Sequence, residues 1–396
     1  MTQETRPIAA SDATLSAQPR VWVLADERPG NTTQALGLAL ALGWPYEIKE
    51  LRFLSAIPWR QRQLGVWDAS LQHVDRSRST VLRPPWPDLV IAAGWRLAIV
   101  SRWIKKQSHE HTRLVQLGRK GSHVAQLFDV VVSCGYFHLP PHPRRIELMA
   151  PLSQTASEKI AEAQARWQSL FAQIPRPHVV ILVGGSTKRH RWNAEVAGRL
   201  GQEVREFAER IGGSVLAVTS RRTGPEATAT LQVALSRHHV HEWQPEQKEN
   251  PYLAYLATAD VLVVTGESES MLAEAAAMGK PTYIYPLDER PPRSFKAHLK
   301  KLIVRHAYPQ GWREKTLSLP RRILVWMCQR LIDYGVVRPR RDLPEFHRSL
   351  VRHGFARFWG EPYTGELQVP LREIETVAQR VREVLQERDG LRGSRR

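Results

Sequence analysis

Cysteine is scarce in this chain of 396 residues, which contains only Cys134 and Cys328. Neither belongs to a CxxC pair or to a Cys/His ligand cluster, so we expect no cysteine-held metal. Cys134 ends an apolar run and is expected in the core. Such a low thiol count is typical of a protein that works in a reducing compartment, and we expect the cytoplasm.

Long apolar runs are also missing. None approaches the roughly 18 residues of a membrane-spanning helix. The first 20 residues, MTQETRPIAASDATLSAQPR, are polar and contain no apolar segment of the kind that secretory signals carry. We expect no secretory signal there, and we expect residues 1–20 to be a disordered leader.

Several common ligand-binding signatures are absent from the sequence. No GxGxxG marks a standard nicotinamide site, and no GxxxxGK[ST] spacing marks a P-loop. Nothing reads as a helix-turn-helix, a zinc finger or an aromatic RNA-binding platform. We therefore expect no nucleic-acid partner and no bound cofactor, and we give no prediction of the oligomeric state.

Positive charge is abundant. The formal net charge is +18 and the isoelectric point is about 10.3. Three partners fit such a balance: nucleic acid, an anionic membrane surface, or a phosphorylated substrate. Tryptophans beside arginines, at Trp59-Arg60 and Trp312-Arg313, are candidates for a membrane interface. Without a nucleic-acid signature, an anionic acceptor or an anionic membrane surface is the expected partner.

Short apolar runs alternate with helical patterns, and 396 residues are more than one core usually serves. Continuous apolar runs favour strands buried on both faces, and intervening helices favour a parallel sheet. In the first half we expect helices over 32–42 and 94–104. The predicted strands there are Val21–Ala25, Asp88–Ala93, Arg113–Leu117 and Asp129–Ser133.

A proline-rich break separates two such halves. A polar helix pattern over 154–173 runs into Pro175 and Pro177, which cannot continue a helix. The second half repeats the plan, with predicted strands at His178–Val183, Ser214–Thr219, His239–Trp243, Asp260–Thr265 and Thr282–Tyr285. Basic helical patterns follow at 294–305, 321–334 and 371–388. The predicted organisation is a leader over 1–20, α/β domains over 21–173 and 177–305, and a basic helical extension over 306–396.

Ligands of open parallel sheets bind at the carboxyl ends of the strands, which directs attention to the loops there. One such loop offers Gly184 and Gly185 for close backbone approach, and Ser186 and Lys188 for an anion. Tight turns are the alternative interpretation of these glycines. A second loop, Thr219–Thr223, combines Thr219 and Ser220 with two arginines. Arg221 and Arg222 form a plausible diphosphate clamp, and a solvated basic turn is the alternative.

The loop after Asp260–Thr265 is the most specific. Ser268 is a natural N-cap of the following helix, whose free amides can hold a phosphate. Glu274 lies about one and two-thirds turns further on, where a carboxylate can accept both hydroxyls of a ribose. Simple helix capping is the alternative for Ser268 and Glu269.

Loops of the first half offer a second set of polar groups. Gly30 permits a flexible turn, with Asn31 and Gln34 as polar contacts, and Gly94 follows the Asp88–Ala93 run. Asp26 and Glu27 are the best candidates for a catalytic base at this cleft.

Five segments in a fixed order carry a family resemblance: WVLADERPGNTTQALGLALALG, PDLVIAAGWR, VGGSTK, TSRRT and GESESMLAEAAAMGKPTYIYPL. They resemble the bacterial members of the family named for the plant elongated-mitochondria (mitochondrial fission) protein. The resemblance covers roughly residues 21–302. It implies a fold similar to the GT-B glycosyltransferases, with two facing Rossmann-like domains. It also implies that the second domain holds a nucleotide-sugar donor and the first receives the acceptor.

The resemblance assigns residues by position. Glu274 matches a ribose-binding glutamate, and Ser268, Ser270 and Met271 match the start of its helix. The segments Thr219–Arg221 and Gly184–Ser186 match loops that face the diphosphate. Gly30, Asn31 and Gln34 would face the acceptor.

We therefore expect a glycosyltransferase that moves a sugar from a nucleotide-diphosphate donor, its co-substrate, to an acceptor such as a phosphorylated cell-envelope glycolipid. The plant relatives recruit a dynamin-like protein to mitochondria, so a non-catalytic scaffold on a protein or membrane partner is the first alternative. A nicotinamide-dependent nucleotide-sugar epimerase is a weaker alternative, because the GxGxxG signature is missing.

Overall fold

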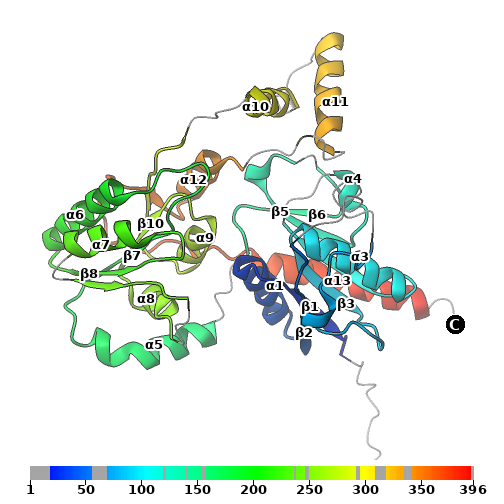
Figure 1. Cartoon of the computed structure of the whole chain (residues 1–396), viewed down its shortest axis with the longest axis horizontal. Coiled ribbons are helices and arrows are strands. Elements are labelled where there is room, and N and C mark those ends of the chain that lie inside the picture. The colour runs from blue at the N-terminus through cyan, green and yellow to red at the C-terminus, as the bar shows by residue number, and fades with distance from the viewer. Residues whose placement is uncertain are drawn as a thin grey trace, which may run out of the picture.

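The computed structural model describes residues 18–55, 69–118, 122–139, 141–152, 157–235, 238–245, 249–290, 295–307, 318–333, 337 and 341–393. Most of the predicted leader, Trp59-Arg60 and Trp312-Arg313 lie outside these residues. The chain forms two six-stranded sheets, each flanked by helices (Figure 1). Every paired strand runs parallel to its neighbour. The predicted α/β class with two Rossmann-like parallel domains is confirmed.

The first sheet has the strand order β2 (Tyr46–Glu50), β1 (Val21–Ala25), β3 (Leu89–Ala93), β4 (Arg113–Leu117), β5 (Val130–Cys134) and β6 (Arg145–Leu148). Strands β1, β3 and β5 are buried along their whole length, as their continuous apolar sequences predict. Strands β2 and β6 were not predicted from the sequence. Both lie at sheet edges and are mostly polar, and apart from the buried Leu148 their side chains are partly or fully exposed.

The second sheet has the order β12 (Arg357–Phe358), β11 (Thr282–Tyr285), β10 (Val261–Thr265), β7 (His178–Leu182), β8 (Ser214–Val218) and β9 (His239–His241). Counted from β7, this is the 3-2-1-4-5-6 order of dinucleotide-binding folds. The five predicted strands are present within one or two residues of their expected ends. The sixth, β12, is two residues long and was too short to predict.

Helices cover both faces of each sheet. On the first sheet, α1 (Pro29–Leu42) and α13 (Ile374–Gly393) pack on one face and α3 (Trp95–Gln107) on the other. On the second, α6 (Ala194–Arg210) and α7 (Pro225–Ala234) pack on one face. The opposite face carries α5 (Ser157–Phe171), α8 (Tyr252–Thr258), α9 (Glu269–Ala277) and α12 (Leu343–Arg352). The remaining helical segments are η2 (Arg76–Arg78), α4 (Ser122–Ala125), η3 (Gly135–Phe137), α10 (Phe295–Ala307) and α11 (Leu319–Asp333).

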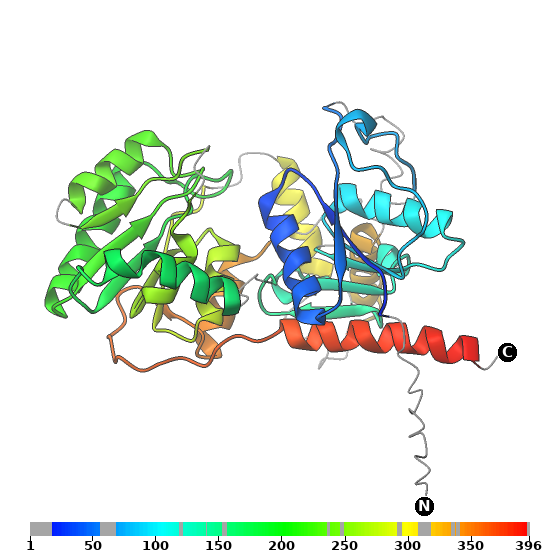
Figure 2. The ribbon, with the colours of Figure 1, turned by 90° about the horizontal axis from the view of Figure 1, so that it is seen from below.

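The chain crosses between the two domains twice. It first leaves the sheet of β6, and α5 contributes Phe171 to the core of the second domain. It later leaves β12 and returns to the first domain, where α13 packs against α1 (Figure 2). Segments outside the predicted range 177–305 therefore complete the second core. The Glu373 carboxylate joins the two crossings, because it accepts the N–H groups of Met149 at 2.7 Å and Ala150 at 3.1 Å.

No helix among the described residues is both long enough and apolar enough to cross a bilayer.

The buried ring of Phe346 provides a test of this arrangement. It is fully buried, and its centroid lies 4.8 Å from that of Tyr136 of the first domain. We expect Phe346→Ala to lower the free energy of unfolding by about 3–5 kcal/mol, measured by urea denaturation, because it leaves a cavity. The control is Arg348→Ala on the same helix, an exposed ion-pair partner worth less than about 1 kcal/mol. Equal stabilities for the two variants would contradict the assignment of α12 to the core.

Candidate functional site

A cavity of about 540 Å³ lies between the two domains. Its walls come from the carboxyl ends of β1, β3, β4 and β5 in the first sheet and of β8 and β10 in the second. Each sheet reverses its strand order at this place, between β1 and β3 and between β7 and β10. Such switch points are where open parallel sheets bind ligands, because loops on either side turn in opposite directions.

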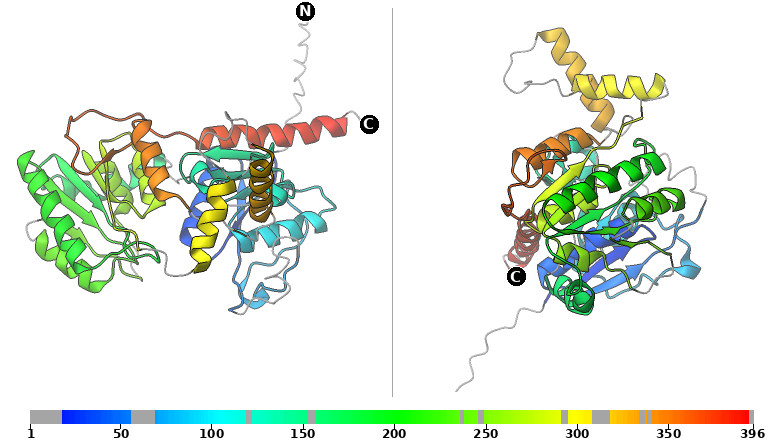
Figure 3. Two further views of the ribbon diagram at one scale, coloured as in Figure 1. Left: turned by 90° about the horizontal axis from the view of Figure 1, so that it is seen from above. Right: turned by 90° about the vertical axis from the view of Figure 1, so that its left-hand side faces the viewer.

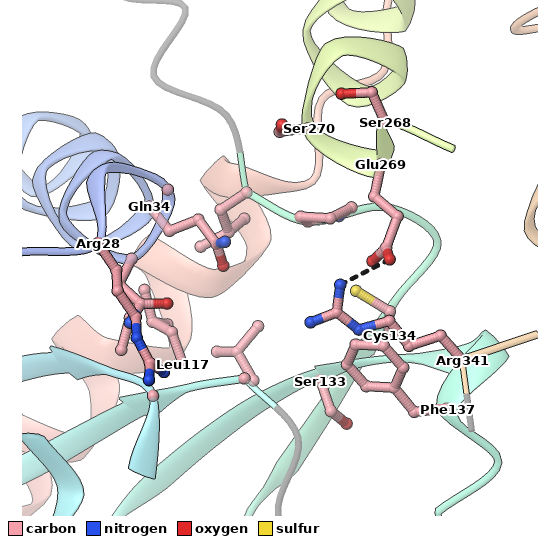
Figure 4. A pocket seen from close by; sticks show the side chains of 18 of the residues that line it. Arg28, Gln34, Leu117, Ser133, Cys134, Phe137, Ser268, Glu269, Ser270 and Arg341 are labelled. Carbon is pink, nitrogen blue, oxygen red and sulfur yellow. Dashed lines mark hydrogen bonds and ion pairs between the residues drawn. The ribbon is translucent and has the colours of Figure 1, made fainter. Parts of the chain in front are cut away.

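The N-terminus of α9 opens on the cavity. Ser268, Glu269 and Ser270 line it, and Arg28, just before α1, and Gln34 of α1 line a neighbouring wall (Figure 4). Ser268 occupies the predicted N-cap position, but its hydroxyl makes no capping bond within the described chain. The amides of this helix end therefore keep the partial positive charge that favours an anion.

The loop after β8 brings two arginines to the same wall. Arg221 and Arg222 line the cavity, and both side chains are exposed. The Arg222 Nη2 atom lies 3.8 Å from the Glu267 Oε1 atom.

Two glycines hold this loop against the one after β7. Gly185 has φ +124°, and a Cβ atom there would come within 2.3 Å of the Arg222 carbonyl oxygen. A Cβ on Gly184 would lie 1.9 Å from the Glu267 Oε1 atom. Ser220 donates its hydroxyl hydrogen to the Gly184 carbonyl. The glycines thus serve close packing between the loops that carry the arginines.

The structure separates the predicted phosphate-binding residues into two groups. Arg221, Arg222, Ser268 and Ser270 line the cavity. Thr219 is buried, and its hydroxyl accepts the Trp243 N–H at 2.8 Å. The predicted residues that are not on the cavity wall are Gly184, Gly185, Ser186, Lys188, Thr219, Ser220, Met271 and Glu274.

Glu274 is half-buried in α9 and is not part of the cavity wall. It accepts the hydroxyl hydrogen of Tyr252, from α8. Burial raises the pKa of the Glu274 carboxyl to about 7, and the Tyr252 hydrogen bond opposes that shift in part. This carboxyl is therefore poised between its two protonation states near neutral pH.

Glu267 is a site residue that the sequence did not single out. Its side chain is fully buried, and its Oε1 atom accepts the Gly185 N–H at 2.6 Å. The Oε2 atom has no hydrogen-bond partner within the described part of the chain. Burial raises the pKa of this carboxyl, against the lowering effect of the Gly185 N–H and Arg222.

Glu269 connects the two domains at the cavity edge. Its Oε2 atom accepts the Tyr136 hydroxyl at 2.6 Å, and its Oε1 atom lies 2.7 Å from the Arg341 Nη1 atom (Figure 4). Burial, followed by Cys134 and Glu269, raises the pKa of Tyr136 far above its usual range, so this hydroxyl stays a donor. Arg341 lies outside every strand-end loop, so no sequence signal indicated it.

The first-domain candidates also differ in position. Glu27, Gly30, Asn31, Gln34 and Gly94 line the cavity, whereas Asp26 lies just behind them.

Asp26 and Glu27 have different surroundings. Asp26 accepts the Arg28 N–H at 3.1 Å and the Asn31 side-chain amide at 3.4 Å. Burial raises the pKa of Asp26 despite these bonds. Glu27 accepts the Phe53 N–H at 3.3 Å and lies 3.9 Å from an Arg96 nitrogen.

The chemistry that these groups support is anion binding with acid–base assistance. Burial raises the pKa of the Cys134 thiol, which lines the cavity, to about 12. This thiol therefore stays protonated at neutral pH and is a poor nucleophile. Among the described residues, no group of three or more His, Cys, Asp and Glu side chains is arranged to hold a metal ion.

The pKa of Glu274 yields a testable pH dependence. An unfolded-state glutamate titrates near 4.3, below the value of about 7 in the folded protein. Between these values the unfolded chain loses the proton and the folded chain keeps it. The contribution of Glu274 to stability therefore falls as the pH rises from about 4.3 to 7.

Glu274→Gln removes this titration and keeps an acceptor for Tyr252. Relative to the wild type, we expect the variant to gain about 2 kcal/mol of stability between pH 5 and pH 8, measured by urea unfolding. Glu206→Gln, which removes an exposed carboxylate on α6, is the control and should show no such gain. A difference between Glu274→Gln and wild type that is constant with pH would contradict the prediction.

Two solved structures are among those to which the chain shows some structural similarity. The Neisseria meningitidis UDP-GlcNAc 2-epimerase, bound to UDP-GlcNAc, is 12% identical with a TM-score of 0.42, covering 93% of this chain and 100% of that one. A Polygonum tinctorium UDP-glucosyltransferase is 12% identical with a TM-score of 0.42, covering 94% and 100%.

Relatives by sequence are more informative. The mitochondrial fission protein ELM1 of Arabidopsis thaliana is 24% identical over 267 residues, or 61% of this chain and 62% of that protein. The Rickettsia prowazekii (strain Madrid E) protein RP120 is 26% identical over 307 residues, or 67% and 82%. The chain thus spans less than two thirds of the length of the Arabidopsis relative. The family model described as Mitochondrial fission ELM1 matches residues 29–321, most of the chain, and the protein belongs to this family.

Proposed function

We propose that the protein is a glycosyltransferase that moves a sugar from a nucleotide-diphosphate donor to an anionic acceptor, such as a phosphorylated cell-envelope glycolipid. The observation that carries this proposal is the single cavity onto which the carboxyl ends of both sheets open. One wall offers cations and helix amides, and the other offers carboxylates. Donor and acceptor would meet between them.

The second-domain wall would hold the donor. The amides at the start of α9 and the exposed side chains of Arg221 and Arg222 suit a diphosphate. The same groups would offset the charge that develops on the leaving diphosphate. Glu274 would accept the ribose hydroxyls, for which Tyr252 would have to yield part of its hydrogen bond.

Acidic residues on that wall weaken its attraction for an anionic donor. Glu267 and Glu269 lie at the start of α9, where they oppose a diphosphate. Both are compensated in part, Glu267 by Arg222 at 3.8 Å and Glu269 by Arg341 at 2.7 Å. Arg221, whose side chain is exposed, is therefore the cation we expect to contribute most to phosphate affinity.

The first-domain wall would activate the acceptor. Glu27 lines the cavity, and Asp26 lies behind it with a pKa raised by burial, which makes it a stronger base than an ordinary aspartate. Gly30, Asn31, Gln34 and Gly94 would contact the acceptor. A lipid acceptor would bring the protein to the inner face of the cytoplasmic membrane, where we propose that it attaches peripherally.

A non-catalytic scaffold is the second candidate function. Two carboxylates at the N-terminus of α9, those of Glu267 and Glu269, favour it. They form ion pairs with arginines that would otherwise be available to a donor diphosphate. The family is also named for mitochondrial fission and not for a reaction. Such a scaffold would keep the fold and bind a protein or membrane partner.

Binding of nucleoside diphosphates tests the donor wall. We expect at least one of UDP, GDP, ADP, CDP and TDP to bind the purified protein in calorimetry. Arg221→Ala should weaken that binding about 10- to 100-fold, because it removes hydrogen bonds to a charged group. Arg210→Ala, exposed at the far end of α6, is the control and should bind like wild type. Failure of all five nucleotides to bind, or wild-type affinity in Arg221→Ala, would overturn the proposal.

Turnover separates the enzyme from the scaffold. We expect donor hydrolysis or transfer to a phosphorylated glycolipid, with Asp26→Asn or Glu27→Gln lowering kcat about 100-fold or more and leaving donor affinity unchanged. Glu50→Gln, exposed at the end of β2, serves as the control. Tight donor binding with no turnover by the wild type would favour the scaffold.

A further inference from the structure

Helices α10 and α11 form a hairpin that projects from one side of the molecule, clear of both sheets (Figure 3, right). The two helices pack against each other through a small apolar core of their own. Its buried members are Ala307, Cys328, Ile332 and Val337, with Ile303, Val304 and Leu331 partly buried around them. This core leaves another face of α11 without a partner in the described chain.

That other face is apolar. Leu319, Ile323, Trp326 and Met327 are 69%, 52%, 56% and 52% exposed. Steps of three and four residues place these side chains on one face of the helix. The residues of α11 that pack into the hairpin core, such as Cys328 and Ile332, lie on the opposite face. Since soluble proteins rarely expose contiguous large apolar side chains, such a face marks an interaction site.

Exposed cations occur on both helices of the hairpin. Lys300 and Arg305 of α10 and Arg321, Arg322 and Arg330 of α11 are exposed. Over 298–307 and 318–332, the sequence contains no Asp or Glu. The Arg330 guanidinium carbon lies 5.6 Å from the centre of the Trp326 ring. The hairpin therefore combines an apolar stripe, an amphipathic tryptophan and several exposed cations.

We propose that the α10–α11 hairpin is the surface by which this protein docks on an anionic lipid bilayer. Apolar side chains would enter the boundary between headgroups and acyl chains, with the tryptophan at that boundary and the basic side chains against lipid phosphates. A second copy is a poor occupant, because two chains of net charge +18 would bring their basic hairpins together. The proposal adds a surface to the peripheral attachment proposed above, and it holds whether or not the cavity is catalytic.

Co-sedimentation of the full chain with lipid vesicles tests the surface. One set of vesicles is phosphatidylcholine, and the other contains phosphatidylglycerol in addition. We expect binding to the anionic vesicles and little to the neutral ones, weakening as salt is raised. Ile323→Gln with Met327→Gln, and separately Arg321→Glu with Arg322→Glu, should each weaken binding at least about tenfold.

Two matched controls keep the test specific. Leu367→Gln with Val369→Gln changes exposed apolar residues outside the hairpin, and Arg76→Glu with Arg78→Glu makes the same charge change in the first domain. Both should bind vesicles like wild type, and all variants should bind nucleoside diphosphate like wild type.

Three results would overturn the docking surface: equal binding to both vesicle types, equal losses in hairpin and control variants, or no vesicle binding at all. Light scattering tests whether a second copy covers this face instead. If the wild type self-associates without lipid and the double variant Ile323→Gln with Met327→Gln does not, the face is an interface between two copies. If the wild type binds no nucleoside diphosphate, the result counts against the transferase proposal and does not affect the hairpin proposal.

Discussion

The ion-paired Glu269 carboxylate is the contact on which the shape of the cavity depends. It accepts a hydrogen bond from Tyr136 at the end of β5 and pairs with Arg341, which precedes α12. The same junction is extended by the Tyr136–Phe346 ring contact and by His138 at 3.2 Å from Asp342. One polar and aromatic cluster thus holds the carboxyl edge of the first sheet against the start of α9. The switch points of the two sheets face one cavity as a result.

That arrangement has an electrostatic cost at the site itself. Glu267 is buried, and one of its oxygens has no partner in the described chain. The Gly185 N–H and Arg222 at 3.8 Å replace only part of the hydration that this carboxyl loses on burial. A structure selected for stability alone would place an amide or an apolar side chain there. Such unfavourable buried groups are more common at functional sites, because ligand binding requires polar groups that do not stabilise the fold.

The sequence predicted the buried strands well because their signal is local. Val21–Ala25 and Val261–Thr265 are continuous apolar runs, and each identifies itself without reference to the rest of the chain. The edge strand Tyr46–Glu50 alternates with charged residues and resembles a loop, since its place in the sheet depends on pairing with β1. The sequence also predicted which loops follow the central strands, and several of their polar residues line the cavity.

Other parts of the site depend on tertiary contacts that no local pattern contains. Arg341 reaches the cavity from a segment late in the sequence, and Tyr136 lies in η3, for which no sequence pattern predicted a role. The roles of Gly184 and Gly185 were open for the same reason. The close neighbours of these glycines are Arg222 for Gly185 and Glu267 for Gly184, and both come from loops far away in the sequence.

The distribution of charge changes what the composition implies. A net charge of +18 fits a phosphorylated substrate or an anionic surface equally well. In the cavity, four arginines stand against three glutamates, and two of those arginines already hold a carboxylate. On the α10–α11 hairpin, the exposed cations have no acidic residue among the described side chains beside them. The unpaired positive charge is therefore greater on the hairpin than in the cavity. The selectivity of the cavity for a ligand then depends on geometry, that is, on the helix amides of α9, on Arg221 and on the fit of the ligand between the two walls.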